Sequence, residues 1–128
     1  MSTALDAGEG SARANRRTGP IDLDHLGRQA LGDPGLADEV LRLFGKMSRV
    51  YMDRVEASAD EPSLIAHLRI LKSAASGVGA WCVRDLARIA EDELRLGLPL
   101  NPERLNDLAI AVEECRAFIA GLLPDGRG

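Results

Sequence analysis

Aromatic side chains are nearly absent from this chain of 128 residues, which has one Trp, one Tyr and two Phe. The core must therefore be built from Leu, Val, Ile, Ala and Met, and such a composition suits interdigitating helices. The length allows one domain with a substantial core but not two. Hydrophobic residues make up 45% and charged residues 28%, which is typical of a soluble globular domain.

Several function classes are disfavoured by what the sequence lacks. No apolar run reaches the length of a membrane span, and no basic-then-apolar leader opens the chain, so we expect a cytoplasmic protein that makes no membrane contact. The net charge is −4 and no basic face with interleaved aromatics is visible, which argues against nucleic acid as a partner. We also expect no cofactor.

Cysteine is scarce as well, and this bears on disulfides and metals. Cys82 and Cys115 both lie inside helical patterns, so we expect reduced core thiols, with a disulfide as the alternative. A zinc site would have to combine them with His25 and His67 from four separate helices, without any CxxC or HxxxH spacing. We therefore expect no metal site.

One stretch, Ser63–Trp81, organises the chain. Its apolar residues recur at the period of a helix with one buried face, and they are Leu64, Leu68, Leu71, Ala75 and Val78. At about 100° per residue, Arg69, Ser73 and Ser76 point away from that face, with Lys72 on their flank. The pattern predicts an exposed surface of small residues carrying two cations. The Gly-x-Gly that follows is not preceded by a strand, so we interpret it as a helix terminator and not as a dinucleotide loop.

The flanking segments also predict helices. Asp22 is a candidate N-cap for a short helix, with Leu23, Leu26 and Ala30 on its apolar side, and turn residues at 32–35 end it. A long helix is expected from Leu36 to about Ser58, with its core face formed by Leu36, Val40, Leu43, Phe44, Met47, Val50 and Tyr51. Asp60 is expected to cap the central helix, with Pro62 in its first turn.

Two further helices follow the central one. The first is expected from about Ala80 to Leu96, with one face formed by Cys82, Leu86, Ile89, Ala90 and Glu93. The same helix carries an acidic cluster of Glu91, Asp92 and Glu93. We expect this cluster to be solvated, with Glu93 near the edge of the bundle. Asn101 is expected to cap the second, whose apolar face comprises Leu105, Leu108, Val112, Cys115, Ile119 and Leu122.

No stretch alternates in the manner of a strand. The sequence therefore predicts an all-α fold, an antiparallel up-down four-helix bundle with a short additional N-terminal helix capping one end. We expect residues 1–19 to be a disordered tail, residues 20–123 to form the helical domain and residues 124–128 to be a frayed end.

The run Leu71-Lys72-Ser73-Ala74-Ala75-Ser76-Gly77-Val78-Gly79-Ala80-Trp81 resembles the signature of histidine phosphotransfer (HPt) domains. In that family the helix reads roughly His-x-Leu-Lys-Gly-Ser-Ala, followed by a Val/Leu-Gly-Ala turn. The segments before it are also similar to HPt proteins, so the resemblance covers Pro20 to about Leu94. The phosphorylated histidine of the family stands three residues before the Lys, where this chain has Arg69. The Gly after the Lys is replaced by Ser73.

The resemblance implies a signalling domain of a two-component phosphorelay that has lost its phosphoacceptor. A guanidinium stays protonated and has no lone pair with which to attack an aspartyl phosphate. It can still donate a bidentate hydrogen bond to a carboxylate or phosphate. We therefore predict a non-enzymatic pseudo-HPt domain that docks on the receiver domain of a response regulator, or on a sensor histidine kinase, through Arg69, Lys72, Ser73 and Ser76.

Two alternatives stay open. His67 could serve as the phosphoacceptor of a working phosphotransfer protein, although it lies about 160° around the helix from Arg69, at the edge of the core stripe, where a satisfied border residue is the plainer interpretation. Alternatively, the chain could be a helical adaptor or homodimer outside two-component signalling. The sequence does not determine the oligomeric state.

Overall fold

The computed structural model describes residues 19–123, which form five α-helices and no strand. The helices are α2 (Leu23–Gln29), α3 (Pro34–Ala57), α4 (Glu61–Val78), α5 (Trp81–Arg95) and α6 (Pro102–Leu122). The predicted all-α class is thus confirmed for this part of the chain. The predictions for the N-terminal tail and for the C-terminal end fall, apart from Gly19, outside the described residues.

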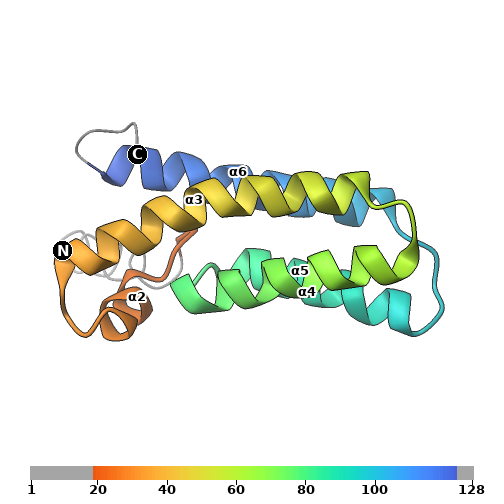
Figure 1. Cartoon of the computed structure of the whole chain (residues 1–128), viewed down its shortest axis with the longest axis horizontal. Coiled ribbons are helices and arrows are strands. Elements are labelled where there is room, and N and C mark those ends of the chain that lie inside the picture. Colours follow the sequence, from red (N-terminus) through yellow and green to blue (C-terminus); the bar gives the residue numbers. More distant parts are fainter. Residues whose placement is uncertain (1–18, 124–128) are drawn as a thin grey trace, which may run out of the picture.

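The four long helices lie alongside one another, and consecutive helices run in opposite directions (Figure 1). α3 packs against α4 and α6, and α5 packs against the same two helices. The short α2 contacts α3 and α4. None of the helices within residues 19–123 is long and apolar enough to cross a lipid bilayer.

Side-chain caps set the starts of four helices. The carboxylate of Asp22 accepts from His25 N at the start of α2, and that of Asp60 accepts from Ser63 N at the start of α4. The amide oxygen of Asn101 caps α6 in the same way. All three were predicted from sequence. α3 begins two residues earlier than expected because the Asp33 side chain accepts from the N–H groups of Gly35 and Leu36.

The central helix buries the predicted stripe. The buried residues of α4 are Leu64, Leu68, Leu71, Ala75 and Val78. α4 then ends at Gly79, which adopts φ +83° as its C-cap, so the Gly-x-Gly does terminate the helix. The prediction succeeds here because one apolar stripe is continuous along α4, whereas the outward side is mostly small or charged, with Ile70 as an exposed exception.

The predicted core face of α5 was wrong. Its buried residues are Val83, Ala87, Ala90, Glu91 and Leu94. Only Ala90 belongs to the expected set, and Cys82 is exposed instead of being a core thiol. The stripe that packs inward is Val83, Ala87, Ala90 and Leu94, and Glu91 is buried beside it, where it pairs with cations from α4 and α5. Cys115 is buried, as expected, and burial raises the pKa of its thiol to about 12.

The core face of α3 was also misplaced. Its buried residues are Leu41, Phe44, Ser48, Met52 and Val55, and only Phe44 was expected among them. α3 has apolar residues on two adjacent faces, and the helical period alone selected the other one. That second face, which includes Val40, Leu43, Met47 and Tyr51, lies along a surface groove described below. On α6 the predicted face is buried at Leu108, Val112, Cys115 and Ile119, whereas Leu122 is exposed.

Candidate docking face on α4

The outer face of α4 carries the four side chains that the sequence singled out. Arg69 and Ser73 are exposed, while Lys72 and Ser76 are half-buried. Arg69 and Lys72 lean toward α5, since both form ion pairs with a residue of that helix. Ser73 also lines the groove between α4 and α3, so it lies between the cations and that groove. We call Arg69, Lys72, Ser73 and Ser76 the α4 face.

The carboxylate of Glu91 holds the cations of this face in place. Lys72 Nζ donates to Glu91 Oε1 at 2.9 Å, and Arg69 Nε lies 3.4 Å from Glu91 Oε2. A third cation comes from α5 itself, where Arg95 Nε donates to Glu91 Oε2 at 2.9 Å. The side chain of Glu91 is only 4% exposed, whereas Arg69 is 60% and Arg95 46% exposed. Glu91 is therefore a buried anchor beneath three partly solvated cations.

The charge state of Glu91 follows from these contacts. Burial by itself would raise the pKa of the carboxyl group, but hydrogen bonds from Lys72 and Arg95, reinforced by their charges, outweigh burial and hold the pKa below its usual value. Glu91 is therefore ionised at neutral pH. Our expectation of a solvated Glu91 was wrong, whereas Asp92 is exposed and Glu93 is half-buried, paired with Arg104 of α6.

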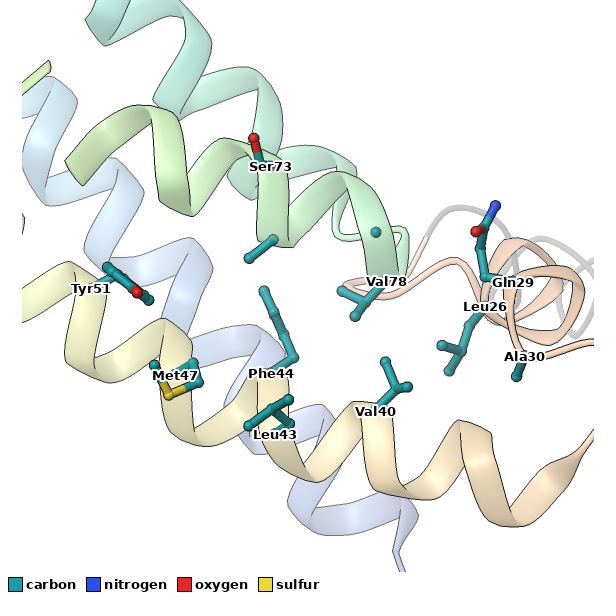
Figure 2. A pocket seen from close by; sticks show the side chains of 12 residues that line it. Leu26, Gln29, Ala30, Val40, Leu43, Phe44, Met47, Tyr51, Ser73 and Val78 are labelled. Carbon is teal, nitrogen blue, oxygen red and sulfur yellow. The ribbon is translucent and has the colours of Figure 1, made fainter. Parts of the chain in front are cut away.

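Small residues leave the middle of the α4 face accessible. The Ser73 hydroxyl forms no hydrogen bond with any described residue, and it points away from the apolar side chains of α3 (Figure 2). The Ser76 hydroxyl is satisfied internally, because it donates to Lys72 O at 2.9 Å. A Cβ added at Gly77 would meet no atom within 4 Å. Another molecule could therefore approach the α4 backbone closely at Ser73 and Gly77.

An apolar groove of about 380 Å³ runs beside this face. Side chains from α2 and α3 form its floor and far wall, and the last turns of α4 form the near wall (Figure 2). Its lining includes Val40, Leu43, Phe44, Met47, Tyr51 and Ala74. Leu43 remains 61% exposed at the rim of this groove. The two cations of the α4 face thus lie on the side toward α5, and the apolar groove lies on the side toward α3.

A polar latch ties α2 to the C-terminal end of α4. Asp22 N donates to Gly79 O at 2.9 Å, and the Asp22 carboxylate accepts from Trp81 Nε1 at 3.0 Å. His25 lies edge-on to Trp81, with ring centroids 4.7 Å apart, and its Nε2–H donates to Ser76 O at 3.0 Å. The latch fixes the last turn of α4, where the α4 face ends. Sequence reasoning placed His25 outside the motif, and only the packing of α2 brings it there.

His67 lies on the opposite side of α4 from the cations. Its Nδ1 atom is 3.3 Å from Ser58 Oγ at the end of α3. This is the position that a border residue would take, and it does not belong to the α4 face. Within residues 19–123 no three His, Cys, Asp or Glu side chains are gathered as ligands for a metal ion.

Two features of this region were missed from sequence. Glu91 was assigned to a solvated acidic cluster, although its position three residues before Leu94 and one after Ala90 was a signal for the buried stripe of α5. The α3 face that lines the groove was predicted, but as a core face, because the groove itself depends on how α2 and α3 sit beside α4. Comparison with models of known protein families and with curated proteins finds no match to this chain.

Proposed function

We propose that this chain is a pseudo-HPt domain, an antiparallel four-helix bundle that docks on the receiver domain of a response regulator without accepting phosphate. The observation that carries the proposal is the placement of Arg69. Its guanidinium stands exposed on the α4 face, at the position that matches the family's reactive histidine, and it is held there by the buried carboxylate of Glu91.

The chemistry of Arg69 supports binding over transfer. A guanidinium has five N–H donors and no acceptor, so it cannot form a bond to phosphorus. It can bind the carboxylates of a receiver's phosphoacceptor pocket. Lys72 lies beside it on the same anchor and adds a second positive charge toward an acidic partner. In this role the domain would regulate or sequester its partner.

The groove supports a protein partner as opposed to a small anion alone. Ser73 belongs both to the α4 face and to the groove lining, so the two surfaces are continuous. When the acidic pocket of the receiver sits on Arg69, apolar side chains of the receiver would therefore cover the groove. Small residues at Ser73 and Gly77 let the two backbones come close. The contact would then combine an apolar part with a charged part, as protein interfaces commonly do.

The experiment that tests this proposal mixes the chain with receiver domains from the same genome, each radiolabelled at its aspartate, and follows binding and label transfer together. We expect one receiver to bind without label reaching this chain, and Arg69→Glu to weaken that binding at least tenfold. The matched control is Arg88→Glu, because Arg88 is an exposed arginine of α5 whose one ion pair within residues 19–123 is with Asp92, outside the α4 face. Equal binding by the Arg69 and Arg88 variants would refute the docking face.

One observation favours the alternative of phosphotransfer through His67. The Ser58 hydroxyl donates to Arg54 O at 2.7 Å, so it must accept from His67 Nδ1–H. Neutral His67 then carries its lone pair on Nε2, the atom it would need for nucleophilic attack. Label on the chain that disappears in His67→Ala would establish this function in place of the pseudo-HPt role. A salt-stable homodimer that masks Arg69, with no receiver bound, would instead favour the adaptor.

A further inference from the structure

Three cations converge on one carboxylate at the border of α4 and α5. Arg69 and Arg95 approach the same oxygen, Glu91 Oε2, at 3.4 and 2.9 Å, so their guanidinium groups are neighbours. Lys72 takes the other oxygen at 2.9 Å. A single negative charge cannot neutralise three positive ones, and the cluster keeps a net charge of about +2 at neutral pH.

The mode of attachment leaves the outer donors of both arginines uncommitted. Each is held by its Nε atom, the nitrogen closest to the backbone. Beyond Glu91, neither Arg69 nor Arg95 has a hydrogen-bond or ion-pair partner among residues 19–123. The terminal NH₂ groups of both are therefore available to a ligand. Because these side chains are already anchored, less rotamer entropy is lost when they bind.

We propose that Arg69, Lys72 and Arg95 form a binding site for a phosphoryl dianion, organised by Glu91 as a positioning residue. Two guanidinium forks and one ammonium group match the several oxygens of a phosphoryl group, and the charge of about +2 matches its charge of −2. A single carboxylate offers two oxygens and one charge, so it would leave part of the cluster unmatched. This inference rests on the proposed function, because the site lies on the proposed docking surface. There it would make the domain bind the phosphorylated state of its receiver in preference to the unphosphorylated one.

The site itself is tested with inorganic phosphate on the full chain. NMR would follow the Nε–H signals of the arginines during titration at pH 7.5, with sodium chloride at the same ionic strength as the reference. We expect saturable shifts at Arg69 and Arg95 with phosphate only, and at least tenfold weaker binding in Arg95→Ala. Arg88→Ala, a matched arginine of the same helix, should leave the affinity unchanged. Shifts that chloride reproduces, or that Arg95→Ala leaves intact, would overturn the site.

The role of Glu91 is separated from mere stability by a second variant. Glu91→Gln keeps the shape of the side chain and removes its charge, so the arginines lose their anchor while the cluster becomes more positive. If Glu91 positions them, phosphate should bind at least fivefold more weakly in Glu91→Gln despite the added positive charge. Tighter binding in a folded Glu91→Gln would show that charge alone governs the site and would overturn the positioning role. If this variant does not fold, Arg95→Ala decides the proposal.

The link to the receiver is tested by binding the partner with and without beryllofluoride, a mimic of the aspartyl phosphate. We expect at least tenfold tighter binding of the beryllofluoride form, and loss of that preference in Arg95→Ala. Equal affinity for both forms, with no phosphate response, would overturn this inference and leave the receiver-docking proposal standing. If the chain bound phosphate but no receiver, the dianion site would stand and the docking proposal would fail.

Discussion

Trp81 Nε1 donates to the Asp22 carboxylate at 3.0 Å, across 59 residues of sequence. Through this bond the segment before α2 is fastened to the first residue of α5, directly after the turn that ends α4. The turn itself is fastened by Asp22 N, which donates to Gly79 O. The end of the α4 face therefore depends on a residue that lies far from the motif in sequence.

Gly79 and Gly97 provide a matched pair for measuring how tightly α2 is packed on that turn. Both have positive φ, +83° and +84°, so Ala at either position costs about 1–2 kcal/mol of conformational energy. A Cβ at Gly79 would also lie 2.9 Å from Asp22 Cβ, whereas at Gly97 it would meet nothing within 4 Å. Urea unfolding should therefore show Gly79→Ala to be destabilised by at least about 1 kcal/mol more than Gly97→Ala. Equal losses would mean that α2 yields to the added methyl group.

The Asp22 carboxyl group should make the fold sensitive to acid. Burial would raise its pKa, but hydrogen bonds from His25 N and Trp81 Nε1 prevail and lower it from 3.8. A depressed pKa stabilises the folded state above the unfolded-state pKa, and this stabilisation is lost as the pH falls through the folded-state value. Asp22→Asn should thus lose less stability than the wild type between pH 5 and pH 3. Circular dichroism during urea titration at each pH measures this, and parallel pH profiles would contradict it.

Glu91 should contribute more to stability than a neighbouring acid in an accessible ion pair. In Glu91→Gln the charged hydrogen bonds to Lys72 and Arg95 are lost, and three cations are left without their counter-charge, so we expect a loss of about 1–3 kcal/mol. Glu93→Gln is the control on the same helix. Its partner Arg104 is partly solvated, so solvent screens the pair and we expect a smaller loss than at Glu91. A smaller loss at Glu91 than at Glu93, measured by urea unfolding, would be inconsistent with a buried anchor.

Gly77 should separate folding from docking. It is helical, and an added Cβ would meet nothing within 4 Å, so Gly77→Ala should stabilise the domain by about 0.5–1 kcal/mol. Gly77→Leu should fold as well but should weaken receiver binding at least tenfold, since its side chain would fill the accessible surface beside Ser73 at the end of the α4 face. Gly121→Leu on α6 is the matched control, because it too meets nothing within 4 Å and lies on another helix. If Gly121→Leu reduced binding equally, the docking surface would lie elsewhere.

Arg69→His offers a gain-of-function test. If the α4 face docks on a receiver as an HPt domain does, an imidazole at this position should receive the phosphoryl group, and the chain should acquire acid-labile label from a phosphorylated receiver. Arg88→His places an imidazole on an exposed part of α5 and should stay unlabelled. Binding without label in Arg69→His would show that the receiver docks in a different orientation.

The sequence alone was sufficient for features that arise within one helix. The stripe Leu64, Leu68 and Leu71 predicted the buried face of α4, and Asp22, Asp60 and Asn101 were recognisable as caps because a capping side chain bonds to N–H groups two or three residues away. The common side of Arg69, Ser73 and Ser76 followed from the same helical period. Such features depend on short-range geometry, which the order of residues determines directly.

Only the tertiary structure decided which face α3 and α5 bury and what surrounds the α4 face. Glu91 is buried because cations from two helices meet it there, and a local pattern contains no information about the partner helix. The same holds for the groove beside Ala74, which depends on α2 and α3, and for His25, which reaches Ser76 across 51 residues. Burial of a charged group depends on whether its compensating charges are brought together, and that is settled only when the helices pack.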